Sequence, residues 1–239
     1  MIGPSGDVIK RLMNSVILRS LLILLLGVRF ALALEPTPRP DPARFAGEIA
    51  TFTKQEPEKG GIVFTGSSSI RLWPHLNKDF PGLPIVNRGF GGSLANDLIV
   101  YFDTVVARHE PKLVVAYAGG NDIEKKLTVQ ETFDDCTHFL TLTHERFPKA
   151  RVILNSVKIA PKRVMQIPQV NELNERLQTW SAAKDWLRFL DSTSYLADAQ
   201  GLPIPNYFRA DNLHLNDSGY AKWQAILDPV LREEWDKVK

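Results

Sequence analysis

Five short apolar runs, each followed by a longer amphipathic stretch, constrain this chain more than any other feature of its sequence. The runs occupy residues 61–65, 84–87, 112–118, 151–155 and 187–191. They are mostly continuous in apolar character, as is typical of strands that are buried on both faces of a sheet. Strands that alternate with helices along a chain form a parallel sheet with helices on both faces. The sequence therefore predicts an α/β sandwich of three layers.

The stretches between the runs carry apolar residues at helical spacing. In 93–108, for example, Leu94, Leu98 and Phe102 fall on one stripe. The same spacing predicts three further helices, over 128–147, 170–186 and 217–237. With 239 residues, of which 44% are hydrophobic and 23% charged, the chain has the composition of a globular domain, which excludes a disordered or collagen-like protein.

The N-terminal segment has the layout of a signal peptide. Basic residues precede an apolar core at 21–28, and Ala31-Leu32-Ala33 matches the small-x-small pattern of a cleavage site. The uncharged core is far shorter than the ~20 residues that span a bilayer. We therefore expect residues 1–34 to be a signal peptide that directs export to the periplasm or the medium. A membrane anchor formed by residues 13–34 is the alternative.

The segment after the leader separates it from the predicted domain. Four prolines in residues 35–42 indicate a linker, so the folded domain is expected over 43–239. Residues 1–34 carry a net charge of +3, and the remaining 25 basic and 26 acidic residues sum to −1. A nucleic-acid-binding protein concentrates basic charge in its folded part, so no nucleic-acid partner is expected. The single cysteine, Cys136, excludes an internal disulfide and a zinc site built from cysteines.

Four polar or glycine-rich clusters stand where a site is expected in such a fold. Parallel α/β sheets bind ligands at the carboxyl ends of their strands. Three of the clusters directly follow the first three apolar runs, and the fourth lies near the end of the chain. They read Gly66-Ser67-Ser68-Ser69, Arg88-Gly89-Phe90-Gly91-Gly92-Ser93, Gly119-Gly120-Asn121-Asp122 and Asp211-Asn212-Leu213-His214.

Together the clusters contain the parts of an acyl-transfer site. A serine becomes a nucleophile when a histidine accepts its proton, and a carboxylate orients that histidine. Asp211 and His214 are three residues apart, so one turn can hold the carboxylate against the imidazole. The N–H of the serine, the N–H of Gly92 and the amide of Asn121 are candidate donors to an oxyanion. The residues alone leave open which serine of 67–69 attacks, or whether the run only caps a helix.

These residues resemble the sequence blocks of the SGNH/GDSL hydrolase family. Gly66-Ser67-Ser68-Ser69 is similar to its first block, usually Gly-Asp-Ser, with Ser67 in place of the aspartate. The resemblance implies that Ser68 is the nucleophile. The other three clusters are similar to the remaining blocks, in family order, over 62–220. That resemblance implies that Ser68, Gly92 and Asn121 supply the oxyanion donors. It also implies that Asp211 and His214 complete the triad with Ser68. For Asp122, in the third block, a cap of the turn or helix after Asn121 is expected, with a part in substrate binding as the alternative.

The resemblance also implies a fold and an activity. It implies a flavodoxin-like sandwich with five parallel strands, and a serine esterase or acylhydrolase without metal or organic cofactor. The expected substrate is a small-molecule, glycan or lipid ester. The chain is expected to be a monomer, with membrane contact only through the leader if that segment stays uncleaved.

The same residues leave two alternative functions open and exclude two other motifs. A lysophospholipase-like acylhydrolase at a membrane surface and a non-catalytic envelope protein that binds glycans stay open as alternatives. A dinucleotide fingerprint begun at Gly89 fails because Leu94 occupies its last glycine position, and an α/β-hydrolase elbow begun at Gly66 fails at Ile70. Trp73 and Phe90 lie in or beside the blocks and line either a substrate pocket or the core.

Overall fold

The computed structural model describes residues 35–239, in which Pro38–Lys239 form one compact unit. The predicted signal peptide, with its alternative as a membrane anchor, lies outside the described residues. Within residues 35–239, no helix is both long enough and apolar enough to cross a membrane.

A five-stranded parallel sheet forms the middle layer of this unit. Its strands lie in the order β2-β1-β3-β4-β5, and all four pairings are parallel. The strands are β1 (Ile62–Gly66), β2 (Ile85–Gly89), β3 (Leu113–Tyr117), β4 (Arg151–Asn155) and β5 (Leu187–Leu190). Each overlaps one of the five apolar runs. The predicted fold class, an α/β sandwich around a five-stranded parallel sheet, is confirmed.

The two faces of the sheet bury separate hydrophobic cores. Along β3, Leu113, Val115 and Tyr117 join the core on one face, and Val114 and Ala116 join the core on the other. Successive side chains of a strand point to opposite faces, so a strand covered on both sides needs an apolar residue at every position. This is why the runs are continuous in apolar character.

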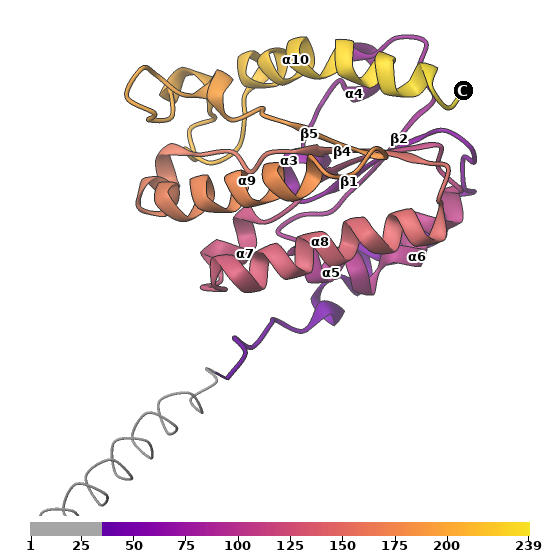
Figure 1. The fold of residues 1–239 in the computed structure, drawn as a ribbon, viewed down its shortest axis with the longest axis horizontal. Coiled ribbons are helices and arrows are strands. Elements are labelled where there is room, and N and C mark those ends of the chain that lie inside the picture. Colours follow the sequence, from indigo (N-terminus) through magenta and orange to yellow (C-terminus); the bar gives the residue numbers. More distant parts are fainter. Residues whose placement is uncertain (1–34) are drawn as a thin grey trace, which may run out of the picture. The chain divides into compact units, whose positions relative to one another are not determined.

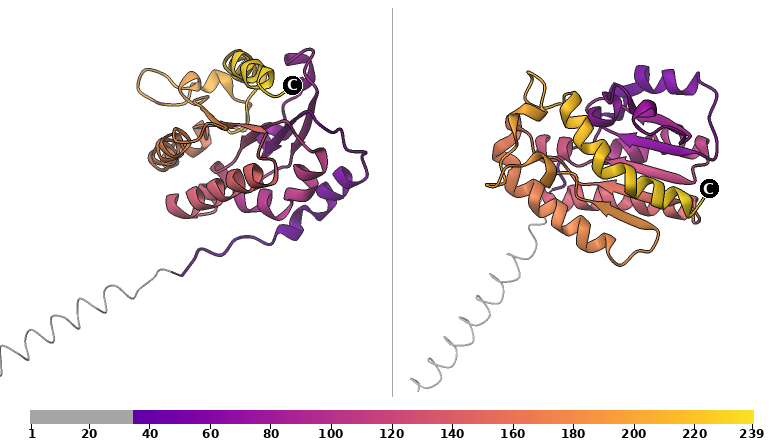
Figure 2. Two further views of the ribbon diagram at one scale, coloured as in Figure 1. Left: turned by 45° about the vertical axis from the view of Figure 1, so that its right-hand side comes forward. Right: turned by 90° about the horizontal axis from the view of Figure 1, so that it is seen from above.

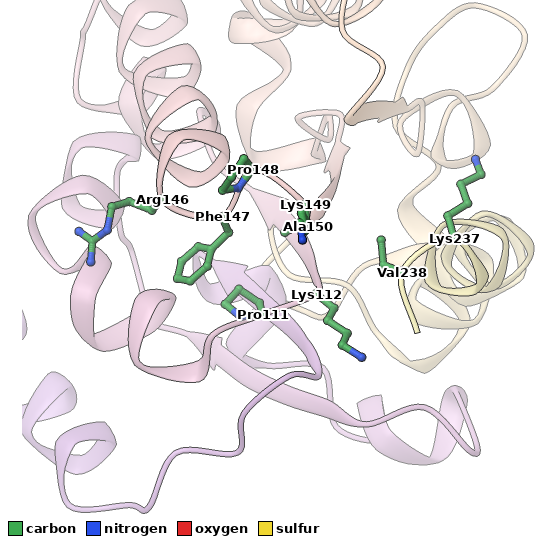
Figure 3. Close-up of a pocket in the computed structure, with 9 residues that line it drawn as sticks. All are labelled: Pro111, Lys112, Arg146, Phe147, Pro148, Lys149, Ala150, Lys237 and Val238. Carbon is green, nitrogen blue, oxygen red and sulfur yellow. The ribbon is translucent and has the colours of Figure 1, made fainter.

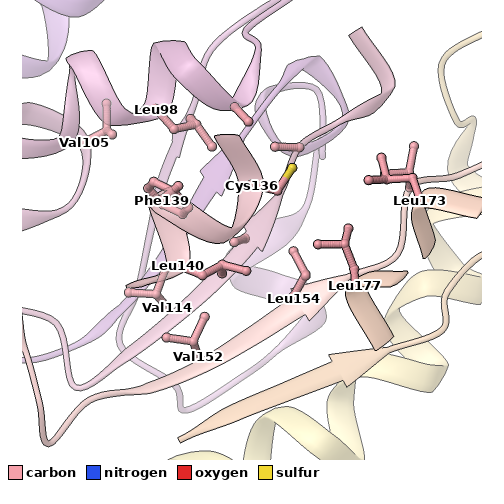
Figure 4. Packing of buried hydrophobic residues seen from close by; sticks show 14 of the residues in the cluster. Leu98, Val105, Val114, Cys136, Phe139, Leu140, Val152, Leu154, Leu173 and Leu177 are labelled. Atoms are coloured by element: carbon pink, nitrogen blue, oxygen red, sulfur yellow. The ribbon is translucent and has the colours of Figure 1, made fainter. Parts of the chain in front are cut away.

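Helices cover both faces (Figures 1 and 2). One face carries α2 (Ala46–Thr53), α5 (Ala95–Val100), α6 (Phe102–Val105), α7 (Gly120–Glu124), α8 (Val129–Arg146) and α9 (Ile167–Ser181). The other carries α3 (Ser68–Arg71), α4 (Leu76–Asp79) and α10 (Asp217–Asp236). Short 3-10 helices are η1 (Pro42–Phe45), η2 (Ala107–His109), η3 (Pro161–Gln166), η4 (Ser194–Leu196) and η5 (Pro205–Tyr207). Figure 4 shows residues of α5, α8 and α9 packed against β3 and β4.

Two of the four predicted helices differ from the structure. The stretch 93–108 forms α5, α6 and η2 instead of one helix, because the backbone leaves the helical region at Tyr101 and Val106. Adjacent β-branched pairs stand at both breaks, 99–100 directly before Tyr101 and 105–106 including Val106, and such residues lower helix propensity. Helix α9 begins three residues earlier than expected and ends at Ser181, since residues 182–186 turn into β5. The other two helices match within one residue.

Candidate active site

The turn from β1 into α3 places Ser68 at the carboxyl edge of the sheet. Gly66 ends β1 with φ +140°, and a Cβ there would lie 2.1 Å from the carbonyl oxygen of Tyr117 on the neighbouring strand. Only glycine permits this close approach of two backbones. The chain then enters α3, whose first residue is Ser68. The local sequence thus directs the serine into the space at the end of the sheet.

Ser68, His214 and Asp211 form one continuous set of hydrogen bonds. His214 Nε2 lies 2.9 Å from Ser68 Oγ, and His214 Nδ1 lies 2.6 Å from Asp211 Oδ2. Ser68 and His214 are 146 positions apart in sequence, and the fold brings them together here. The arrangement can pass a proton from the hydroxyl to the ring while the carboxylate holds the ring nitrogen that faces it.

The Asp211 carboxylate also builds the turn that carries the histidine. Its Oδ1 accepts hydrogen bonds from the backbone N–H groups of Leu213 and His214, each at 2.9 Å. Asn212 sits in the left-handed region, with φ 57°. Desolvation raises the pKa of the Asp211 carboxyl, but the hydrogen bonds from the His214 ring and from the two N–H groups outweigh it and hold this pKa well below its usual range. The carboxylate is therefore charged at neutral pH.

The neighbouring serines have other surroundings. Ser67 and Ser69 are buried. Tyr220 donates its hydroxyl to the carbonyl oxygen of Ser69 at 2.9 Å. Within residues 35–239, Ser68 is the member of this run whose hydroxyl contacts His214. This contact distinguishes Ser68 from the serines on either side of it, which spacing alone could not do.

The three predicted oxyanion donors come from segments that follow neighbouring strands. Ser68 follows β1, Gly92 follows β2 and Asn121 follows β3, and β1 lies between the other two. Gly92 has φ +79°, a backbone conformation that favours glycine. Neither the N–H of Ser68 nor that of Gly92 donates to an acceptor in the described part of the chain. Asn121 Nδ2 donates to the carbonyl oxygen of Ser93 at 3.0 Å, which leaves its second N–H for another acceptor.

Asp122 does more than cap its own turn. Its side chain is fully buried, and Oδ1 accepts a hydrogen bond of 2.9 Å from the N–H of Ala95 at the start of α5. Burial raises the pKa of Asp122 to about 7, against the effect of the Ala95 hydrogen bond; Asp135 and Asp97 raise it further. The tertiary fold thus brings another helix to this carboxyl group, a contact that the expectation of a local cap did not include.

Sequence reasoning missed two cations that follow β4. Lys158 donates from Nζ to the carbonyl oxygen of Leu213 at 2.8 Å, and Arg163 donates from Nη2 to Asn121 Oδ1 at 3.1 Å. Burial lowers the pKa of Lys158 to about 7, Arg163 lowers it further and Asp211 opposes the shift. Their place after an apolar run was the only available signal, since the contacts join residues 42 and 55 positions apart.

Trp73 and Phe90 belong to the hydrophobic cores. Both side chains are buried, Trp73 beside Phe64 and Phe80 on one face of the sheet, and Phe90 beside Phe45 on the other. Of the two interpretations that the sequence left open, core packing is therefore the one found.

A separate cavity lies at the opposite edge of the sheet (Figure 3). Its lining residues precede β3 and β4 or end the chain: Pro111, Lys112, Arg146, Phe147, Pro148, Lys149, Ala150, Lys237 and Val238. It is thus at the amino edge, away from Ser68 and His214. No group of three or more His, Cys, Asp or Glu side chains in residues 35–239 is placed to hold a metal ion.

Comparison with known proteins gives a family match and many similar folds. The model of the GDSL-like lipase/acylhydrolase family matches residues 59–222. No curated protein sequence matches the chain. A candidate acylhydrolase from Bacteroides fragilis has a TM-score of 0.68 and 23% identity, over 82% of this chain and 99% of its own.

Two further structures are similar. A GDSL-like lipase from Bacteroides thetaiotaomicron has a TM-score of 0.66 and 23% identity, over 81% of this chain and 98% of its own. A carbohydrate esterase of family 3 from Talaromyces cellulolyticus has a TM-score of 0.60 and 15% identity, over 75% and 100% of the two chains. At these identities the likeness concerns the fold.

Proposed function

Since the chain belongs to the GDSL-like lipase/acylhydrolase family, we propose that it is a serine hydrolase that cleaves a carboxylic ester through an acyl-enzyme. The observation that carries this proposal is the pair of contacts at His214, 2.9 Å to Ser68 Oγ and 2.6 Å to Asp211 Oδ2. A serine that contacts a histidine already oriented by a carboxylate has the geometry of an activated nucleophile.

The proposed reaction has two halves. Ser68 Oγ attacks the acyl carbon while His214 Nε2 takes the hydroxyl proton, and the carbonyl oxygen becomes an oxyanion. When the carbon–oxygen bond to the alcohol breaks, His214 returns the proton to the leaving oxygen and the acyl group stays on Ser68. A water molecule then attacks the acyl-enzyme with His214 again as the base, which releases the carboxylic acid and restores the serine.

Three donors support the proposed stabilisation of the oxyanion. The N–H groups of Ser68 and Gly92 and the second N–H of Asn121 have no acceptor in the described part of the chain. In other acyl-transfer enzymes, one such donor is worth ~3–4 kcal/mol of transition-state stabilisation. Asp211 would stabilise the imidazolium that forms and keep the ring in the tautomer that accepts from serine.

A second candidate is an acylhydrolase that acts on amphiphilic esters at a membrane surface. It is favoured by Val164 and Met165 in η3, which are 45% and 88% exposed and directly follow Arg163, the residue that contacts Asn121. Exposed apolar side chains at the rim of a site suit an apolar substrate or surface. Rates on 4-nitrophenyl esters of increasing acyl length, below and above the micellar concentration, separate the two candidates.

The nucleophile is tested on purified protein with 4-nitrophenyl acetate and a fluorophosphonate. We expect hydrolysis and labelling of Ser68 in the wild type, both lost in Ser68→Ala, because only a serine beside a general base is activated. Ser67→Ala is the matched control and should keep most of the activity. Peptide mass spectrometry identifies the labelled residue. Label on Ser67 or Ser69, or hydrolysis that survives in Ser68→Ala, would overturn the proposal.

A further inference from the structure

The segment that follows β4 contacts both halves of the proposed catalytic apparatus. Lys158 Nζ donates to the carbonyl oxygen of Leu213 at 2.8 Å, and the N–H of Lys162 donates to that of Asn212 at 2.9 Å. Both acceptors lie in the turn between Asp211 and His214. The next residue, Arg163, points instead to the helix that carries Asn121. One short segment therefore connects the turn of the proposed base to the oxyanion asparagine.

Arg163 holds α7 through three of its nitrogens. Nη1 donates to the carbonyl oxygen of Gly120 at 3.0 Å, and Nη2 donates to Asn121 Oδ1 at 3.1 Å. Nε lies 3.3 Å from a carboxylate oxygen of Glu124. The Arg163 side chain is only 18% exposed. A guanidinium in this position presents its donors in a fixed fork, so its contacts constrain direction as well as distance.

These contacts permit one orientation of the Asn121 amide. The amide oxygen faces a guanidinium, which can only donate, and the amide nitrogen faces the carbonyl oxygen of Ser93, which can only accept. A rotation of the amide by 180° would place donor against donor and acceptor against acceptor. Because one N–H is held by Ser93, the direction of the second N–H is set as well. Arg163 thus determines where the free N–H of Asn121 points.

We propose that Arg163 is a positioning residue for the oxyanion hole, which aims the Asn121 amide at the developing negative charge. The inference rests on the function proposed above. It assigns Arg163 no contact with substrate, and its effect on the reaction passes through Asn121. A donor held in advance costs no reorganisation when the charge forms, and this is the source of oxyanion stabilisation.

The test is a double-mutant cycle between Arg163 and Asn121, with kcat and KM measured on 4-nitrophenyl acetate. We expect Arg163→Met to lower kcat about 10- to 100-fold, an effect no larger than that of removing one oxyanion donor. KM should change less than about twofold, since ground-state binding is untouched. In the Asn121→Ala background, the same Arg163→Met change should lower kcat by less than about twofold, because residues that act as a unit are not additive.

Two further variants separate positioning from charge. Lys162→Met removes an exposed cation next to Arg163 and leaves the Lys162 backbone contact in place. The Lys162 side chain makes no hydrogen bond in residues 35–239, so kcat should stay within about twofold of wild type. Arg163→Lys keeps the charge but cannot span Gly120 and Asn121, so we expect it to recover only part of the lost kcat. Melting temperatures confirm that every variant is folded at the assay temperature.

The outcomes that overturn the inference differ from those that overturn the function. An equal loss of kcat from Arg163→Met with and without Asn121 would mean that the cation acts directly on the oxyanion, and an unchanged kcat would remove Arg163 from the reaction; either result rejects the positioning role. If instead the wild type hydrolyses no ester, or hydrolysis persists in Ser68→Ala, the proposed hydrolase function itself fails.

Discussion

At the scale of single residues, Asp211 combines a structural task with the proposed catalytic one. One oxygen accepts the N–H groups of Leu213 and His214 and thereby shapes the turn, and the other contacts the His214 ring. The two tasks use different oxygens, so they can be separated by a substitution that alters only one of them. Asparagine is that substitution, since it keeps an acceptor oxygen for the turn and puts a donor against the ring.

We predict that Asp211→Asn lowers kcat by ~10²–10⁴ and leaves KM nearly unchanged. An amide donor opposite Nδ1 favours the tautomer whose Nε2 is protonated, and that tautomer cannot accept the Ser68 proton. The melting temperature should fall only slightly because the turn keeps its acceptor. Both quantities are measured on the same preparation. A marked loss of stability with normal kcat would assign Asp211 to the turn alone.

At the scale of secondary-structure elements, α9 holds the segment that carries both site cations. Asn174 on α9 accepts from the N–H of Val157 and donates to its carbonyl oxygen, each at 2.8 Å. Val157 is buried directly before Lys158. A side-chain amide can satisfy both backbone groups of a residue where the chain leaves the sheet and pairs with no further strand. Helix and segment are therefore joined at one residue.

We predict that Asn174→Ala destabilises the fold by about 2 kcal/mol, for two lost hydrogen bonds at a buried residue. For a domain of this size, that corresponds to roughly 4–8 °C in Tm. The value of kcat should fall as well, since Lys158 and Arg163 follow the released residue. Asn171→Ala is the matched control: the same residue type, three positions earlier on α9 and exposed. Equal effects of the two variants would refute a specific role for Asn174.

At the scale of the whole molecule, a buried acid ties the crossovers on one face of the sheet together. Asp122 connects α7, after β3, to the start of α5, after β2. Its pKa is raised from 3.8 to about 7 chiefly by burial. Between these values the folded protein keeps a proton that the unfolded chain releases, so this group makes the free energy of unfolding fall as pH rises from about 4 to about 7. Its stabilising contribution is complete below that window.

We predict that in Asp122→Asn the free energy of unfolding falls less as pH rises, because asparagine keeps an acceptor for Ala95 and does not titrate. The free energy of unfolding of the variant minus that of the wild type should grow from pH 4 to pH 8, at about 1.4 kcal/mol for each unit of the removed pKa shift. The difference between the two proteins is the quantity to measure by urea unfolding, because buried His109, whose pKa is lowered by desolvation, acts in the opposite direction. A difference independent of pH would contradict the prediction, and exposed Asp134→Asn is the control.

Local pattern by itself was enough for the fold class. A strand buried on both faces needs a continuous apolar run, and a helix against a sheet needs an apolar stripe, so the five strands and the four main helical stretches could be located. Helix ends were less certain. The break at Tyr101 coincides with a hydrogen bond from its hydroxyl to the carbonyl oxygen of Pro42, a contact across 59 positions. No window of local sequence contains such a partner.

For the candidate site, sequence placed the polar clusters at the carboxyl edge, and resemblance to a family assigned their residues. The tertiary structure decided what each polar side chain contacts. Ser68 contacts His214, Asp122 contacts the start of α5, and Arg163 contacts Asn121. Arg163 and Lys158 lie in a segment without periodicity. The physical reason is that periodicity reports which side of an element is buried, whereas a hydrogen bond between distant residues depends on how crossovers bring two loops to the same edge of the sheet.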